Sequence, residues 1–226
     1  MNVLLSGIVG STAYGLNHAG SDIDRLGIFA VPTVELHGLG RPKESVVTTG
    51  PDSTFHEAAK AVALIIKGNP TASEILWLPD DLYEVRTPLG DELIGIREPL
   101  LSEKAVRSAY LGYVDQQFRK LKARGDGTFS SDVRNRSLKH SRHMIRLLGH
   151  AVELHQTGRV TLRVADPEGV RSTAERIVAD PSVGERLIAV AEAAFDRPGV
   201  LPVEPDVAAA EGWLRRVRRE YWTETT

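Results

Sequence analysis

Two neighbouring residues near the amino terminus, Gly10 and Ser11, have the types that phosphate binding requires. They follow an apolar run, Val3–Val9, which we expect to be a buried strand that opens into a short helix. Backbone N–H groups at such a turn, together with a serine hydroxyl, can hold an anion. Glycine turns into helices are common, so an ordinary tight turn is the alternative for this pair alone.

A pair of acids, Asp22 and Asp24, follows within the next few residues. A second strand is expected over Ile23–Val31. Alternate residues of a strand share a face, so on a strand both carboxylates would point the same way, about 7 Å apart at the Cα atoms. Ile23 would then turn into the core. Parallel carboxylates repel unless a cation lies between them, and oxygen ligands suit Mg²⁺ or Mn²⁺. A solvated strand edge is the alternative for the acids alone.

The combination of the two groups is more informative than either. An anion-binding turn directly before a carboxylate pair is what nucleotidyl transfer needs: one metal ion and the turn hold the β- and γ-phosphates, and a second ion activates an acceptor hydroxyl for attack on the α-phosphorus. A third carboxylate normally helps to activate that hydroxyl. The pattern therefore predicts chemistry on a nucleoside triphosphate.

The segment Val9–Phe29, VGSTAYGLNHAGSDIDRLGIF, resembles the Gly-Ser … Asp-x-Asp signature of the DNA-polymerase-β-like nucleotidyltransferase superfamily. Within that superfamily the chain is similar to the predicted nucleotidyltransferases of the RNA-ligase-associated group. The similarity continues through residues 54–60, 67–70 and 139–143 and so covers most of the chain. It implies an NTP substrate and Mg²⁺ or Mn²⁺ as cofactor.

The resemblance assigns roles residue by residue. Gly10 and Ser11 match the phosphate-binding pair, and Asp22 and Asp24 match the metal-binding pair.

The third carboxylate has two candidates. Glu57 begins a predicted helix just after a predicted strand over Ser53–His56, and the group often has an acid there. Asp52, at the start of that strand, is the alternative. If neither reaches the metal ions, the site would be inactive or would bind nucleotide without turnover.

Several cations are candidates for contacts with phosphates. Lys60 lies three residues after Glu57 and would touch the triphosphate or form an ion pair with Glu57. A basic helical face is predicted further on, where residues recur at i, i+3, i+7 and i+10: Arg136, Lys139, His143 and Arg146. This face, with Lys139 and His143 matched by the resemblance, would bind the triphosphate or the acceptor's phosphates, or would be an exposed soluble surface.

The charge distribution separates the chain into an acidic and a basic part. Residues 104–146 contain eleven Lys and Arg against three Asp, a local charge of +8, so the rest of the 226-residue chain carries −10 within a total of −2. The chain has no cysteine, which excludes disulfides and thiolate metal sites. With no apolar run long enough to span a bilayer and no signal peptide, we expect a cytoplasmic protein without a membrane partner.

The predicted fold class is α+β, with a small mixed-sheet nucleotidyltransferase domain over residues 1–101 and a mainly α-helical domain over 102–226. Long helices are expected over Ser102–Ala123 and Arg134–Thr157. Three more are expected over residues 171–179, 182–195 and 206–222. The two tryptophans of the last helix, Trp213 and Trp222, could stack on bases, but we expect both to pack in the core.

The predicted function is transfer of a nucleoside monophosphate from an NTP to a hydroxyl acceptor, with release of pyrophosphate. The basic second part favours a nucleic acid, such as an RNA end, as acceptor. The alternative is a catalytically inactive nucleotide-sensing or RNA-binding module with the same fold. The sequence leaves open which NTP is used, what the acceptor is and what the oligomeric state is.

Overall fold

The chain folds into two compact units in the computed structural model, which describes residues 1–50, 52–122 and 131–222. The first unit comprises Met1–Ser102 and Glu204–Thr226, and the second comprises Glu103–Val203. The predicted helical domain began at residue 102 and ran to the end of the chain. The structure differs at the end of the chain, because Glu204–Thr226 belongs to the first unit.

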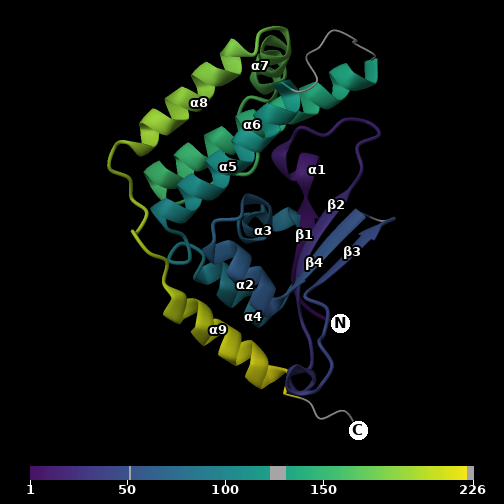
Figure 1. Cartoon of the computed structure of the whole chain (residues 1–226). Coiled ribbons are helices and arrows are strands. Elements are labelled where there is room, and N and C mark those ends of the chain that lie inside the picture. The colour runs from purple at the N-terminus through teal and green to yellow at the C-terminus, as the bar shows by residue number, and fades with distance from the viewer. Residues whose placement is uncertain (51, 123–130, 223–226) are drawn as a thin grey trace. The chain divides into compact units, whose positions relative to one another are not determined.

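One mixed sheet organises the first unit (Figure 1). Within the described residues the sheet has five strands in the order β3-β4-β2-β1-β5, and β2 and β4 are parallel while the other pairs are antiparallel. The strands are β1 (Asn2–Val9), β2 (Asp24–Ala30), β3 (Ser45–Thr49), β4 (Asp52–Glu57) and β5 (Tyr83–Arg86). Together with the helical second unit, this sheet confirms the α+β class.

Strand β5 is a member of the described sheet that the sequence pattern does not indicate. Its four residues have little apolar alternation, and its exposed edge position explains why none is needed. It pairs with β1, which lies far from it in the sequence. No local sequence pattern therefore indicates this pairing.

The first unit contains short helices near the sheet. These are α1 (Gly10–Tyr14), η1 (Thr33–His37), α2 (Ala58–Ile66), α3 (Pro70–Ser73), η2 (Glu74–Leu76), η3 (Asp80–Leu82), α4 (Pro88–Gly95) and α9 (Val207–Glu220). Figure 1 shows α2, α4 and α9 gathered beside the sheet, where Leu4, Ile65 and Leu93 are fully buried. Asn69 caps α3 as predicted, accepting a hydrogen bond from the Ala72 N–H at 2.9 Å.

Helix α9 belongs to the first unit because its apolar face completes that core. Trp213 is fully buried, and its indole N–H donates to the Leu89 carbonyl at 2.8 Å. The backbone carbonyl of Arg218 accepts from the Thr33 hydroxyl at 2.6 Å, and the carbonyl of Tyr221 accepts from the Thr33 N–H at 2.8 Å. The prediction that Trp213 packs in the core is confirmed.

The regular elements among the described residues of the second unit are all helices: α5 (Glu103–Lys122), α6 (Ser131–Thr157), α7 (Pro167–Ala179) and α8 (Ser182–Phe195). An apolar stripe at helical spacing runs along α5, where Tyr110, Val114, Phe118 and Leu121 are all buried. A second buried stripe runs along α6, over Met144, Leu147, Leu148 and Ala151. No helix in the described part of the chain is long and apolar enough to cross a membrane.

Candidate active site

Helix α1 follows strand β1 directly at Gly10. Gly10 has φ +67°, a left-handed conformation that residues with a side chain rarely adopt. The half-buried Ser11 follows it, and within the described residues the Ser11 hydroxyl has no hydrogen-bond partner. The strand-to-helix turn therefore presents a free hydroxyl beside backbone N–H groups.

The carboxylate of Asp24 lies directly against this turn. A Cβ atom added to Gly10 would stand 2.1 Å from Asp24 Oδ2, far inside van der Waals contact. The strand register explains the proximity, because Val9, the last residue of β1, pairs with Asp24, the first residue of β2. The structure thus brings Gly10, Ser11 and Asp24 together, as the sequence predicted.

The turn can be tested with two substitutions. We expect Ser11→Ala to weaken NTP binding by roughly 1.5–3 kcal/mol, because one charge-assisted hydrogen bond is removed. Gly10→Val should be more damaging, since it both strains a positive φ and displaces the Asp24 carboxylate. Equilibrium NTP titration measures both effects, and unchanged affinity in both variants would show that the phosphates bind elsewhere.

Asp22 and Ile23 depart from the predicted strand geometry. Strand β2 begins at Asp24, so Asp22 lies in the preceding loop and is exposed. Ile23 is 49% exposed and does not enter the core. The reason is that neither neighbouring strand extends this far, since the register of β1 ends opposite Asp24 and β4 begins at Asp52. Asp22 is therefore placed by a loop and not by the pleat.

A buried hydrogen bond that no sequence motif indicated anchors α1. The hydroxyl of Tyr14, at the end of α1, donates to Glu74 Oε1 on η2, and both residues are buried. Buried tyrosine hydroxyls need a polar partner, so a tyrosine on the apolar side of α1 is the signal that could have indicated one. Glu74 begins η2 directly after α3, the short helix that starts at Asn69-Pro70.

Glu57, the predicted third carboxylate, lies at the far end of its strand from the acid pair. The parallel register pairs Arg25 with Ser53 and Phe29 with Glu57, so Glu57 stands about 16 Å along the strands from Asp24. Its carboxylate forms a two-pronged salt bridge with Arg218 of α9, at 2.6 and 2.9 Å, and accepts from the Ala59 N–H at 2.8 Å. The structure does not bring Glu57 to the acid pair.

The Glu57–Arg218 pair should instead stabilise the first unit. Both side chains are largely buried, at 7% and 18% exposure. Removing one partner of a buried pair leaves an uncompensated charge, so we expect Arg218→Met to lower the free energy of unfolding by about 3 kcal/mol or more. Urea unfolding followed by tryptophan fluorescence measures this. The matched control is Arg25→Met, which breaks the more exposed Arg25–Glu84 pair and should cost under about 1 kcal/mol; equal losses would contradict the prediction.

Asp52, the alternative third carboxylate, lies nearer to the pair. It begins β4 one residue before Ser53, and the β2–β4 register extended by that residue places it beside Asp24 on the neighbouring strand. Neighbouring strands are about 4.8 Å apart, and in-register residues share a face. Asp52 is exposed.

The other residues predicted near the site have partners of their own. Lys60 forms a salt bridge with Glu44 at 3.5 Å, so it does not pair with Glu57 and lies at the same end of the sheet as Glu57. The His56 ring nitrogen Nδ1 lies 2.8 Å from the Ser45 hydroxyl across the strands, and burial lowers the pKa of His56. Arg25 forms a salt bridge with Glu84 at 2.9 Å.

The predicted basic face of α6 is only partly a surface. Lys139 is exposed and Arg136 is exposed, as predicted. Arg146 is 4% exposed and lies between two histidine rings, 3.1 Å from His143 Nδ1 and 3.4 Å from His150 Nδ1. Burial, followed by the Arg146 charge, lowers the pKa of each histidine to about 3. Arg146 is thus a core residue of the second unit, because the helix turns that position inward beside Met144 and Leu147.

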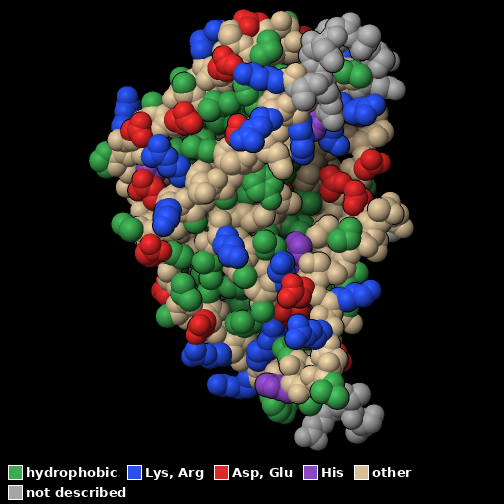
Figure 2. All heavy atoms as spheres, in the orientation of Figure 1, with side chains coloured by type: hydrophobic (Ala, Val, Ile, Leu, Met, Phe, Trp, Pro, Cys, Tyr) green, Lys and Arg blue, Asp and Glu red, His purple; other side chains and the backbone are tan. Residues whose placement is uncertain are grey.

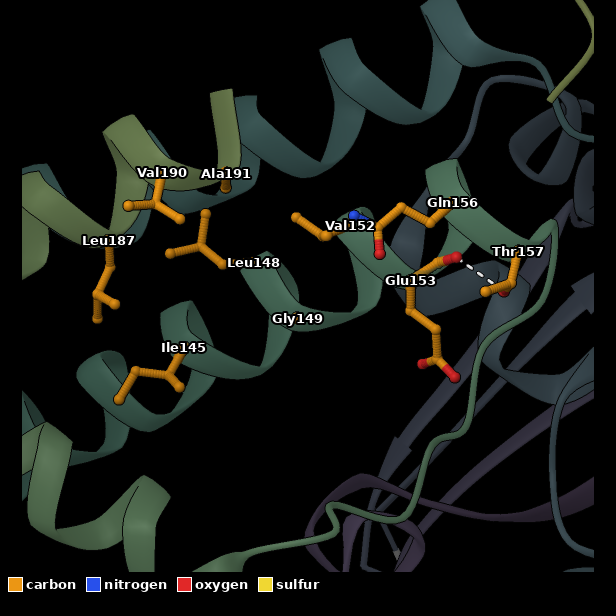
Figure 3. A pocket seen from close by; sticks show the side chains of 10 residues that line it. All are labelled: Ile145, Leu148, Gly149, Val152, Glu153, Gln156, Thr157, Leu187, Val190 and Ala191. Carbon is orange, nitrogen blue, oxygen red and sulfur yellow. Dashed lines mark hydrogen bonds between the residues drawn. The ribbon is translucent and has the colours of Figure 1, made fainter. Parts of the chain in front are cut away.

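A groove between α6 and α8 is unsuited to nucleotide (Figure 3). It has a volume of about 480 Å³, and aliphatic side chains such as Leu148, Val152 and Leu187 dominate its lining. Its carboxylate, Glu153, accepts from the N–H and the hydroxyl of Thr161, and no Lys or Arg is among the described residues that line it. The groove offers nothing to hold a triphosphate.

The acid pair fits a cation that substrate phosphates help to hold. The described residues contain no ready group of three His, Asp or Glu side chains that could bind a metal ion. Mg²⁺ commonly binds through one or two carboxylates, with phosphates and water completing its coordination. Asp24 beside the anion-binding turn, with Asp22 two residues before it, matches that pattern.

Comparison with known proteins supports the interpretation of these motifs. No curated protein matches the chain. A sequence model of the family described as "RNA repair pathway DNA polymerase beta family" (RlaP) matches residues 1–189. That range includes the anion-binding turn, the acid pair and the described helices as far as the first half of α8. The chain therefore belongs to the RNA repair pathway DNA polymerase beta family.

Proposed function

We propose that the first unit transfers a nucleoside monophosphate from an NTP to a hydroxyl acceptor and releases pyrophosphate. The observation that carries the proposal is the contact between the Asp24 carboxylate and the Gly10 backbone. It brings the residue proposed to hold the phosphates and the residue proposed to hold the cation to one point of the sheet. Family membership supports a nucleotidyltransferase-related activity.

Each residue has a distinct role in this proposal. The backbone at Gly10 and the Ser11 hydroxyl hold the phosphates, and Asp22 and Asp24 hold Mg²⁺ or Mn²⁺. When bound, the ion would neutralise phosphate charge and lower the pKa of the acceptor hydroxyl. Asp52 accepts the proton from that hydroxyl, since it is the candidate third carboxylate that lies beside Asp24 in the strand register.

An RNA end is the acceptor that the observations favour. The description of the family mentions an RNA repair pathway, which supports RNA as acceptor, and α6 presents exposed cations such as Arg136 and Lys139. We would replace these two with Gln and leave Arg146 in place, because Arg146 is buried and its removal would disturb the core. The expected result is weaker, less salt-sensitive RNA binding, with a salt slope lower by about 0.7 for each phosphate group that the variant no longer binds.

The test is incubation with each labelled NTP, Mg²⁺ and a mixed RNA pool, followed by assay of pyrophosphate and of labelled product. Asp52→Asn should slow the chemical step, whereas Glu57→Gln should keep turnover under conditions where it remains folded. If Glu57→Gln abolishes turnover in a folded protein and Asp52→Asn does not, the role given to Asp52 is wrong.

A second candidate is a module that binds nucleotide without turnover. It is favoured by the absence of a ready three-ligand group among the described residues, and by the engagement of Glu57 with Arg218. NTP titration that shows binding, with no pyrophosphate released for any NTP or acceptor, would select this candidate over the transferase.

A further inference from the structure

The second tryptophan of the C-terminal segment does not pack as the sequence predicted. Trp222 is 56% exposed, whereas Trp213 is fully buried. The difference follows from the helix, because α9 ends at Glu220 and Trp222 lies beyond the packed face. The Trp222 ring lies beside the exposed His37 ring of η1, with 5.6 Å between ring centroids and an interplanar angle of 50°. Two rings of the first unit thus stand together in solvent.

Two exposed arginines of α9 precede Trp222 in the sequence. Arg215 and Arg219 lie one turn apart on α9, and Trp222 follows the end of the helix, where its backbone N–H donates to the Arg219 carbonyl at 3.3 Å. All three residues are exposed. Figure 2 shows Lys and Arg side chains gathered in the lower part of the view, over the position of α9 in Figure 1. We call Arg215, Arg219, Trp222 and His37 the α9 platform.

The charges of the platform are accessible to a polyanion. Arg215 is engaged only at the surface, in an i,i+4 pair with Glu211 that is worth about 0.3–0.5 kcal/mol and can be exchanged for a phosphate. Arg219 forms no salt bridge within residues that the structure describes. Glu220 follows Arg219 in the sequence and Glu35 precedes His37 by two residues. Both are exposed, and neither pairs with Arg215 or Arg219 in the described structure.

The two other arginines of α9 hold the helix in place. Arg218 binds Glu57, and Arg216 binds Glu92 of α4. The apolar face of α9 is buried through Trp213 and Val217. The platform is therefore a fixed surface with exposed guanidinium groups and an exposed aromatic face.

We propose that the α9 platform binds single-stranded RNA, with a base stacked on Trp222 and the backbone phosphates on Arg215 and Arg219. Aromatic faces accept any base by stacking, and arginines bind the backbone without sequence preference. The choice of RNA as ligand rests on the proposed function. The platform lies outside the part of the chain that the family model matches, except for His37.

The experiment measures RNA binding apart from catalysis. Fluorescein-labelled oligo(A) is titrated with the full chain in EDTA without NTP, and anisotropy is recorded across salt concentrations. Trp222→Ala should weaken binding about 5- to 100-fold, the range expected for losing one stacked base. Arg215→Gln with Arg219→Gln should lower the salt slope by about 1.4. The matched control, Arg176→Gln with Arg186→Gln, changes two exposed arginines of the second unit and should leave binding unchanged.

Tryptophan fluorescence gives an independent readout. Trp77 and Trp213 are buried, so quenching by RNA should report Trp222 and should vanish in Trp222→Ala. Wild-type affinity in both Trp222→Ala and the Arg215/Arg219 variant would overturn the platform, because the RNA would then bind elsewhere. Absence of oligo(A) binding by the wild-type chain would overturn it as well. Platform-dependent RNA binding without nucleotidyl transfer would support the platform and contradict the transferase. If the protein transfers nucleotide to RNA and neither variant changes the RNA affinity or the KM, the transferase is supported and the platform is contradicted.

Discussion

Replacing Asp24 by Asn should lower metal-dependent turnover by about 10³-fold or more. A charged cation ligand is exchanged for a near-isostere, and metal-ion stabilisation of transition-state charge is worth several kcal/mol. The fold should survive, because Asp24 lies at the first residue of β2 and the new side chain has the same shape. The measurement is pyrophosphate release from NTP as a function of Mg²⁺ concentration, with circular dichroism to verify folding.

Two companion variants make this result specific. Asp22→Asn should also lose activity, and a higher Mg²⁺ concentration should restore part of it if the loss is one of cation affinity. Asp81→Asn makes the same chemical change at an exposed position of the first unit and should retain full activity. Wild-type turnover in Asp24→Asn would exclude a mechanism in which the acid pair holds the catalytic cations.

Acidification should unfold the second unit before the first. His143 and His150 have pKa values lowered to about 3 by burial and by Arg146, while unfolded histidine titrates near 6.5. The unfolded chain therefore binds more protons between these values, so stability falls as pH drops below 6.5, by up to about 1.4 kcal/mol per pH unit for each histidine. At pH 4 the loss would be about 3 kcal/mol for each, a large part of a typical domain's stability.

The tryptophans allow the two units to be followed separately. All three, Trp77, Trp213 and Trp222, belong to the first unit, whereas the long helices of the second unit contribute strongly to far-ultraviolet circular dichroism. Helix signal should fall between pH 6.5 and pH 4 while tryptophan emission holds. In His150→Gln, which cannot be protonated, the loss should be shallower. An unchanged pH dependence in that variant, or simultaneous loss of both signals, would contradict the assignment to the buried histidines.

Local chemistry in the sequence was enough to identify the turn and the acid pair. Gly10 before Ser11 requires only an apolar strand that stops and a residue that tolerates positive φ, and both are short-range properties. The register that brings Asp24 to the turn follows from β1 and β2 being consecutive antiparallel strands. The stripes of α5 and α6 were likewise predictable, because a 3.6-residue period records which side of a helix is buried.

The tertiary structure decided what lies around these motifs. Glu57 looked like a catalytic acid because it follows a strand and begins a helix, and only the return of α9 from the end of the chain supplied its partner, Arg218. Arg146 recurs at helical spacing with other basic residues, so the sequence placed it on an exposed basic face. The packing of α6 buries it instead, and a pattern of charges cannot show that packing.

The same distinction separates the two tryptophans of the C-terminal segment. Their sequence neighbourhoods are alike, but Trp213 faces the core of the first unit while Trp222 passes the end of the helix. Residue type and spacing determine the local turn, the strand and the helical face, because these depend on neighbours along the chain. Other properties depend on contacts between segments far apart in sequence, such as α9 and the end of β4. These contacts decide which acid is available to bind a cation and which aromatic ring is exposed to solvent, and they form only when the chain folds.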